Sequence, residues 1–257
     1  MLGIFDTGLG GLSVVRRLRE RLPAHDLLFF ADQAHVPYGA RTPQDLVHLL
    51  KNNLGLLNDA GVSSIVMGCN TSCAIARQFG WPQSHARILD LIEAGVVAVE
   101  QSGAKRIGVI ATQATVNSGA YTKALQRIPG AQITEVAAPT LVPLVESGLA
   151  GTETAQRAVA EVCAQLPTDM DAVVLACTHY PILDLHFADA LGDRVMRIDP
   201  AFAQAECAAQ FAQQNGAHAA GLGDTLYRTN GDVEAFRTSI RMIMGDFSPN
   251  VASLSLV

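Results

Sequence analysis

The sequence predicts an α/β fold with mainly parallel sheets, built as two similar lobes. One observation behind this prediction is that short apolar runs alternate with amphipathic stretches of helical length, a pattern typical of βα units. The other is an internal repeat, in which three features of the first half of the chain recur in the second half. With 49% hydrophobic residues and a mean hydropathy of +0.23, the 257-residue chain can bury a sizeable core.

The predicted elements follow one another in a regular order. Stretches 12–22 and 42–61 repeat apolar residues at the 3.6-residue spacing of a helix and separate the first three strands. Strands that alternate with helices favour parallel sheets. The predicted strands are the short apolar runs at residues 2–5, 26–31, 63–68, 106–111, 131–137, 171–176 and 195–199.

The repeat joins features at offsets of 105, 106 and 108 residues, in the same order. We interpret it as a duplication, although generic βα units also resemble one another. Each lobe would then place a thiol at the carboxyl end of a strand, where open α/β sheets bind ligands. We assign residues 1–92 and 206–257 to the first lobe and residues 93–205 to the second. The repeated features are Gly3–Thr7 with Gly108–Thr112, Val36-Pro37 with Val142-Pro143, and Cys69 with Cys177.

Composition excludes several classes of function. The net charge is −6, and the basic run 16–21 is best read as the solvated face of a helix, so we expect no nucleic-acid partner. No apolar run is long enough to span a bilayer, and the first residues lack the features of a secretion signal. Five widely spaced cysteines indicate free thiols in a reducing compartment. We therefore expect a cytoplasmic protein without a membrane partner.

The cysteines fall into two groups. Cys163 and Cys207 lie in alanine-rich helical stretches, where a thiol is usually an inert small apolar group. Cys69 and Cys177 each end a strand just before a predicted helix, whose amide N–H groups and dipole would favour a thiolate. Polar residues directly follow each of these two cysteines in the sequence. One of them, His179, can hold a proton near neutral pH. We therefore predict that Cys69 and Cys177 are catalytic.

A metal site is a competing interpretation. Cys69, Cys73, Cys177 and His179 could supply four ligands, although their spacing differs from that of a usual zinc site. A redox pair is less well supported, because the sequence has no Cys-x-x-Cys.

Cofactor motifs are also missing. The stretch 6–13, DTGLGGLS, follows the first strand, but Ser13 breaks the dinucleotide pattern. Its exposed amides instead suit a small anion such as a carboxylate. None of the three lysines stands out as a Schiff-base lysine, and no phosphate-binding loop of the Walker type appears. We therefore expect two-thiol chemistry without a cofactor. Further polar clusters at 31–41, 111–121 and 139–148 could supply donors for carboxylate groups.

Six motifs in register carry a resemblance to a known family: FDTGLGGLSV, FADQAHVPYGAR, GCNTSCA, ATQATVNSGAY, LVPLVESG and ACTHYPIL. In this order they resemble the glutamate racemases of the aspartate/glutamate racemase superfamily. The resemblance extends to residues 227–236 and so covers nearly the whole chain. It implies two flavodoxin-like lobes related by a pseudo-twofold axis, no cofactor, and interconversion of L- and D-glutamate. It further implies a role in supplying D-glutamate for peptidoglycan, and a homodimer.

The resemblance also assigns roles to individual residues. Cys69 and Cys177 would be the two acid/base groups on opposite faces of the substrate Cα, the first attacking D-glutamate and the second L-glutamate. Supporting catalytic roles fall to Asp6, His179, Glu146 and Asp32. The residues expected to hold the substrate are Asp6, Thr7, Tyr38, Gly39, Asn70, Thr71, Thr115, Thr178 and His179.

The sequence departs from the family pattern at three places. Thr7 replaces a serine, and Cys73 adds a third thiol one helical turn after Cys69. The third departure is the stretch 89–98, where the family usually has a glycine near Asp90 and a proline near Ala94. These departures keep two alternatives open. One is a racemase or isomerase of another acidic substrate such as aspartate. The other is a non-catalytic regulatory protein on the same scaffold, since some glutamate racemases also bind DNA gyrase.

Overall fold

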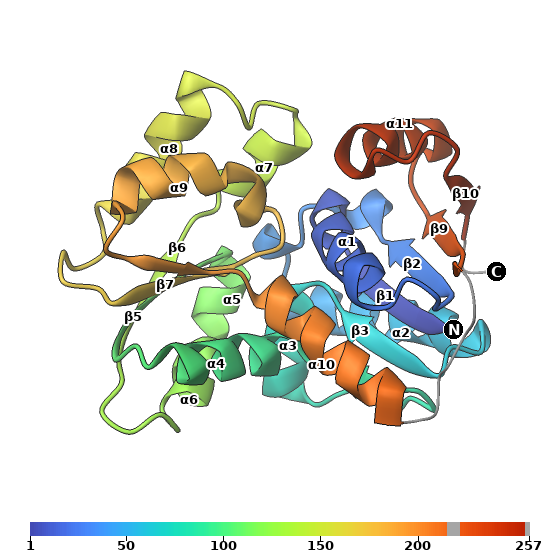
Figure 1. Cartoon of the computed structure of the whole chain (residues 1–257), viewed down its shortest axis with the longest axis horizontal. Coiled ribbons are helices and arrows are strands. Elements are labelled where there is room, and N and C mark those ends of the chain that lie inside the picture. Colours follow the sequence, from blue (N-terminus) through green and yellow to red (C-terminus); the bar gives the residue numbers. More distant parts are fainter. Residues whose placement is uncertain (215–221, 255–257) are drawn as a thin grey trace.

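The structure of the chain is a computed structural model that describes residues 1–214 and 222–254. Two separate sheets, each with all its strands parallel, lie side by side and are covered by helices (Figure 1). The predicted α/β class with parallel sheets is therefore confirmed. No helix within these described ranges is long and apolar enough to cross a membrane.

The first lobe contains a six-stranded sheet in the order β10-β9-β2-β1-β3-β4. Its strands are β1 (Leu2–Asp6), β2 (Leu27–Ala31), β3 (Ser64–Met67), β4 (Arg87–Leu89), β9 (Thr225–Thr229) and β10 (Asn250–Ser253). Its helices are α1 (Leu12–Arg21), α2 (Pro43–Asp59), α3 (Asn70–Phe79) and α11 (Val233–Met244). Short 3₁₀ turns at Leu9–Gly11, Gln33–His35 and Tyr38–Ala40 follow the ends of β1 and β2.

The second lobe contains a four-stranded sheet in the order β6-β5-β7-β8. Its strands are β5 (Arg106–Ala111), β6 (Gln132–Ala137), β7 (Ala172–Ala176) and β8 (Met196–Ile198). Its helices are α5 (Gln113–Ser118), α6 (Ala120–Leu125), α7 (Leu141–Glu146), α8 (Glu153–Cys163) and α9 (Asp184–Leu191), with a 3₁₀ turn at Tyr180–Leu183.

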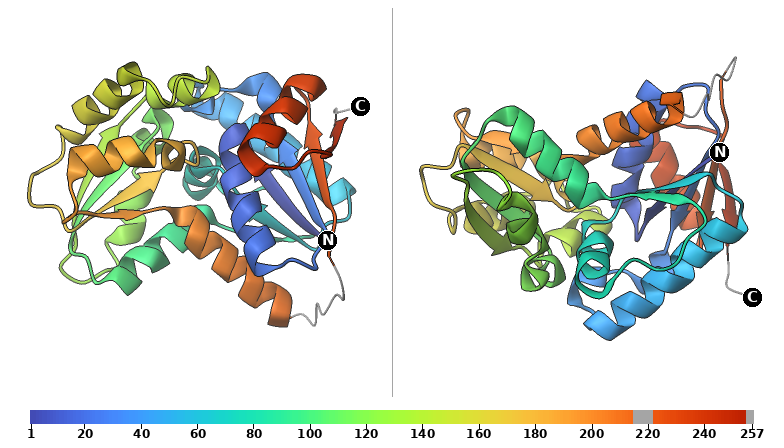
Figure 2. Two further views of the ribbon diagram at one scale, coloured as in Figure 1. Left: turned by 45° about the horizontal axis from the view of Figure 1, so that its top comes forward. Right: turned by 90° about the horizontal axis from the view of Figure 1, so that it is seen from below.

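Two helices carry the chain between the lobes, as both views in Figure 2 show. Helix α4 (Leu91–Ser102) leads into the second sheet, and α10 (Pro200–Gln214) leads back. The side-chain amide of Gln204 in α10 donates to the carbonyl oxygens of Met67 at 2.9 Å and Leu89 at 2.7 Å, which anchors α10 on the first lobe. The divisions that we placed after residues 92 and 205 fall inside α4 and α10, and the exact lobe boundaries stay a prediction.

A shared apolar core joins the two lobes. The largest buried cluster includes Phe5 and Met67 from the first sheet together with Ile107 and Val174 from the second. Every residue of β1, β2, β3 and β7 is buried, as expected for parallel strands covered on both faces. The lobes therefore pack as one body, and their polar strand ends face each other.

All seven predicted strands are present, with ends within two residues of the prediction. Helices predicted at 12–22 and 42–61 are α1 and α2. The sequence analysis missed β4, β9 and β10. These three strands are only partly buried, so their sequences lack the continuous apolar run that identified the others.

Candidate active site

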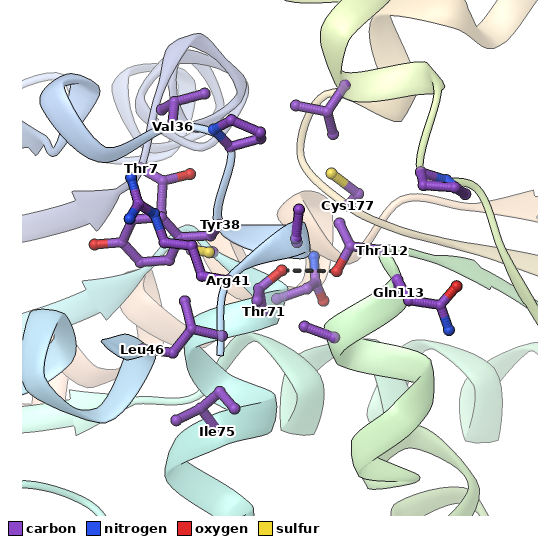
Figure 3. Close-up of a pocket in the computed structure, with 18 of the residues that line it drawn as sticks. Thr7, Val36, Tyr38, Arg41, Leu46, Thr71, Ile75, Thr112, Gln113 and Cys177 are labelled. Carbon is purple, nitrogen blue, oxygen red and sulfur yellow. Dashed lines mark hydrogen bonds between the residues drawn. The ribbon is translucent and has the colours of Figure 1, made fainter. Parts of the chain in front are cut away.

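A cavity of about 420 Å³ lies between the two lobes, where the carboxyl ends of β1 and β3 face those of β5 and β7 (Figure 3). Phe5 of β1 pairs with Met67 of β3, and Ala111 of β5 pairs with Ala176 of β7. The loops after paired strands therefore start at the same level. Because the two lobes face each other, the residues that follow β3 and β7 reach the same cavity, and both thiols line it. The volume is typical of a small-molecule site.

Cys69 enters the cavity from the first lobe as the N-cap residue of α3. Its Sγ accepts the backbone N–H of Ser72 at 3.4 Å, so the predicted position at a helix N-terminus is confirmed. Burial nevertheless raises the pKa of the thiol to about 12, and the negative charge of Asp6 adds to the increase. The N–H of Ser72 lowers the pKa, as expected for a thiol at a helix N-terminus, but desolvation outweighs this contact.

Cys177 enters from the second lobe, and its environment differs from that of Cys69. The predicted helix start is wrong here, because a 3₁₀ turn follows and α9 begins only at Asp184. The polar neighbour of the thiol is instead His179, whose Nδ1 lies 3.8 Å from Sγ. The two thiols thus have different polar neighbours. Cys69 accepts a hydrogen bond from a backbone N–H, whereas Cys177 lies next to an imidazole.

His179 connects Cys177 to a carboxylate. Its Nε2 lies 2.5 Å from Oε1 of Glu146, which also accepts the backbone N–H of Leu9 at 3.2 Å from the other lobe. Burial lowers the pKa of His179, but the contacts with Cys177 and Glu146 outweigh it and hold the pKa well above its ordinary value. Glu146 does not line the cavity. Its catalytic role stays a prediction, and in the structure its carboxylate contacts the imidazole of His179 and raises the pKa of that ring.

Asp6 ends β1 and is buried against the second lobe. Its Oδ1 accepts the N–H of Thr7 at 2.5 Å, and its Oδ2 accepts the hydroxyl of Thr178 at 2.9 Å. Burial raises the pKa of Asp6 to about 6, against the opposing effect of the His179 charge. Asp6 lines the cavity, as do Thr7 and Thr178.

Asp32 does not reach the cavity. It is buried behind Tyr38, whose hydroxyl donates to Oδ2, and Asn53 donates to the same oxygen at 2.8 Å. Burial raises the pKa of Asp32, but the hydrogen bonds, led by that of Tyr38, outweigh it and lower the pKa below its ordinary value. Its other oxygen, Oδ1, lies 2.5 Å from Nδ1 of His35 and accepts from the amide of Asn230. A catalytic role for Asp32 stays a prediction.

Three threonines connect the lobes beside the cavity. Oγ1 of Thr71 lies 2.9 Å from Oγ1 of Thr112, the pair joined by a dashed line in Figure 3, and Oγ1 of Thr112 lies 3.0 Å from Oγ1 of Thr115. Thr71 and Thr112 line the cavity, whereas Thr115 is fully buried behind Thr112. The predicted contact of Thr115 with the substrate stays a prediction, and of the two residues it is Thr112 that lines the cavity.

Two glycines allow the lobes to approach. A Cβ on Gly10 would lie 2.5 Å from Oγ1 of Thr178 and 2.7 Å from Nδ1 of His179. A Cβ on Gly39, a predicted site residue that lines the cavity, would lie 2.8 Å from Cβ of Thr112. Both positions lie where the loop of one lobe touches the other lobe, so only a residue without a side chain leaves the observed fit undisturbed.

Comparison with known proteins decides the family. The model of the Asp/Glu/Hydantoin racemase family matches residues 9–208. This chain belongs to the Asp/Glu/Hydantoin racemase family. Among its relatives, the glutamate racemase of Desulforudis audaxviator is 36% identical over 267 residues, covering 100% of this chain and 98% of the relative. The glutamate racemase of Gloeobacter violaceus is 43% identical over 205 residues, covering 79% and 77% of the two chains.

Solved structures of this racemase family have the same fold. Glutamate racemase from Thermus thermophilus, in complex with β-chloro-D-alanine, superimposes with a TM-score of 0.86 at 32% identity, covering 99% of this chain and 96% of that one. Glutamate racemase from Francisella tularensis, in complex with D-glutamate, gives a TM-score of 0.88 at 27% identity, with 99% and 97% covered. The predicted arrangement of two lobes is therefore confirmed.

The sequence analysis did not single out every residue that lines the cavity, and Thr112 and Arg41 are two examples. Thr112 directly follows β5 and is the counterpart of Thr7 in the internal repeat, so the repeat itself could have identified it. Arg41 also lines the cavity, and its Nε donates to the carbonyl oxygen of His35 at 2.6 Å. It is the last residue of the motif FADQAHVPYGAR, in which only Asp32, Tyr38 and Gly39 were predicted as site residues.

The metal interpretation gains no support from this geometry. Across residues 1–214 and 222–254, no group of three or more His, Cys, Asp or Glu side chains is arranged to hold a metal ion. Cys73, one of the four ligands considered, is fully buried, and its pKa is raised well above the ordinary value, first by burial and then by the nearby charge of Asp90.

Proposed function

We propose that this member of the racemase family is a glutamate racemase that interconverts L- and D-glutamate with Cys69 and Cys177 as its two acid/base groups. The observation that carries the proposal is that two thiols from opposite lobes line one cavity. The relatives that cover nearly the whole chain bear the name glutamate racemase. One similar structure was solved with D-glutamate.

Two acid/base groups explain inversion at Cα. A thiolate on one side of the substrate removes the α-proton, and the thiol on the other side donates a proton to the opposite face of the carbanion. A single base would return the proton to the face that it left. In our proposal Cys69 attacks D-glutamate and Cys177 attacks L-glutamate. The two thiols therefore exchange protonation states in each turnover.

Substrate binding would help to form the thiolate. The pKa of Cys69 is about 12 in the unliganded site, mainly because of burial. The α-ammonium group of an amino acid brings a positive charge between the thiols, and an opposite charge within a few ångströms lowers the pKa of a thiol. Asp6, negatively charged above about pH 6, would pair with this ammonium group. On the other side, the protonated His179 would place a positive charge next to Cys177, because its Nδ1 lies 3.8 Å from Sγ.

Neutral donors around the cavity suit the two carboxylates of glutamate. Thr7, Tyr38, Gly39, Asn70, Thr71 and Thr178 all line the cavity, as predicted for residues that hold the substrate. Thr112 extends the set, with Thr115 supporting it from behind. Arg41 adds a cationic side chain to the wall formed by the first lobe. We propose that these groups orient the substrate so that its Cα lies between the thiols.

The biological setting follows from the resemblance and stays a prediction. We propose that the product D-glutamate serves peptidoglycan synthesis in the cytoplasm, and that the enzyme is a homodimer. Aspartate as the substrate, or a regulatory role without turnover, remains an outcome of the experiment below.

Solvent-deuterium incorporation at Cα tests the proposal. The protein is incubated in D₂O with L-glutamate, D-glutamate or either aspartate, and the α-proton is followed by NMR. We expect exchange with inversion on glutamate, and loss of racemisation in Cys69→Ser and Cys177→Ser. Exchange on aspartate alone would change the substrate and keep the mechanism. Absence of exchange on all four, or full activity of either serine variant, would contradict the proposal.

A further inference from the structure

Asn70 has one half of its amide buried without a partner. It is the first residue of α3, directly after Cys69, and it lines the cavity with 3% of its surface exposed. Within the described part of the chain, its Nδ2 has no hydrogen-bond partner. A buried amide nitrogen with two unused N–H groups is costly unless a ligand accepts from it. In the proposed racemase, a substrate carboxylate in the cavity supplies that acceptor.

The other half of this amide is held from the second lobe. The hydroxyl of Tyr121 in α6 donates to Oδ1 of Asn70 at 2.6 Å, and both side chains are buried. An amide has two nearly equal orientations that exchange its oxygen and nitrogen. A hydroxyl that donates to the oxygen selects the orientation in which Nδ2 stays free for the ligand.

Two further features keep the Tyr121 hydroxyl in this role. Burial raises the pKa of Tyr121 well above its ordinary value, so the hydroxyl keeps its proton and acts as a donor. Gly95 lies inside α4, where a Cβ would come within 3.2 Å of the Tyr121 oxygen. Glycine in a helix interior destabilises the helix relative to alanine, and here its lack of a side chain leaves room for the hydroxyl.

We infer that Tyr121 is a positioning residue, which fixes the Asn70 amide from the opposite lobe so that its N–H groups face the substrate carboxylate. This inference rests on the proposed function for the identity of the ligand. It also makes the contact dependent on how the lobes sit together, since Asn70 and Tyr121 belong to different lobes. Substrate affinity and the arrangement of the lobes are thereby coupled through one hydrogen bond.

Tyr121→Phe removes the hydroxyl alone and keeps the ring. We expect kcat/KM for L- and D-glutamate to fall by a similar factor of about ten, mainly through KM, because a carboxylate contact is made in both ground and transition states. In an Asn70→Ala background, Tyr121→Phe should cause no further loss. If the losses in kcat/KM of the two single variants multiply in the double variant, Tyr121 does not act through Asn70, and the inference is overturned.

A matched control and a second measurement complete the test. Tyr227→Phe removes the hydroxyl of another buried tyrosine, which lies on β9 outside the cavity, and should leave both kinetic constants unchanged. The side-chain amide resonances of Asn70, assigned from their loss in Asn70→Ala, should shift in Tyr121→Phe and stay in place in Tyr227→Phe. This NMR readout needs no turnover. An unchanged Asn70 resonance in Tyr121→Phe overturns the inference, whereas a shifted resonance in a protein inactive on glutamate overturns only the proposed substrate.

Discussion

The buried carboxylate of Asp6 should make the stability of the protein depend on pH in a predictable direction. Its pKa is about 6 in the folded protein, against 3.8 for an ordinary aspartate, because burial disfavours the charged form. The folded protein therefore binds this proton more tightly than the unfolded chain does. Below pH 3.8 both states are protonated and Asp6 costs nothing. As the pH rises through the folded pKa, stability is lost.

The size of the effect follows from the two pKa values. A shift from 3.8 to about 6, at about 1.4 kcal/mol per pKa unit, corresponds to about 3 kcal/mol. The full cost is present above pH 6, where the buried carboxylate is charged in the folded state. Asp6 is only 1% exposed, so solvent screens little of this cost. Asp6→Asn replaces the carboxylate with a neutral group of similar shape and should remove this pH dependence.

Urea unfolding of both proteins between pH 4 and pH 7 measures the effect. Because the unfolded chain is already partly ionised at pH 4, the difference in unfolding free energy between Asp6→Asn and the wild type should grow in favour of the variant by about 2.4 kcal/mol across this range. Asp189→Asn is the control, because it removes the same carboxylate at an exposed position on α9, and its difference should stay flat. A difference for Asp6→Asn that does not change with pH would refute the reasoning. Racemisation should meanwhile be impaired, because Asp6 lines the cavity.

Other substitutions test the packing around the site and the helices. Gly10→Ala places a Cβ against Thr178 and His179 and should lower kcat/KM at least about tenfold. Gly55→Ala, in open space within α2, should instead stabilise the protein by about 0.5–1 kcal/mol in urea unfolding. Equal activity of the two variants would contradict the predicted effect of Gly10→Ala. Thr42→Ala removes the side chain that accepts the N–H of Asp45 at the start of α2 and should cost about 1 kcal/mol, with no change in KM. Phe236→Ala empties a fully buried site in the first lobe and should cost about 3–5 kcal/mol, so a loss below 1 kcal/mol would contradict the packing described.

The sequence allowed good prediction of the elements whose pattern is local. Strands such as β1 and β7 are buried on both faces and read as continuous apolar runs. The edge strands β4 and β10 were not predicted. Each pairs with a single neighbouring strand and is partly exposed to solvent, so its sequence has no continuous apolar run. The residues of the site were predicted as a set, since strand ends collect at one edge of a parallel sheet.

The sequence could not predict how deeply each side chain is buried, or which side chains line the cavity. Thr112 and Thr115 stand three residues apart in one motif, and only the packing of α5 decides which of them faces the cavity. The pKa of Cys69 is a similar case. The helix N-terminus is local, whereas the burial that outweighs it depends on an apolar cluster with residues from both lobes. Long-range packing, and not a wrong pattern, accounts for these differences.

The strand order of the first sheet has a consequence for how the chain is made. Strand β2 pairs with β9 along its length, with Ala31 opposite Thr229, roughly 200 residues later in the chain. The second sheet, β5 to β8, is continuous in sequence. During synthesis from the N-terminus, the lobe that begins first is therefore completed last, and the lobe begun second has all its strands available earlier. Until β9 emerges, one edge of β2 stays open, so the early first lobe is the part of this protein that most needs protection from wrong pairing.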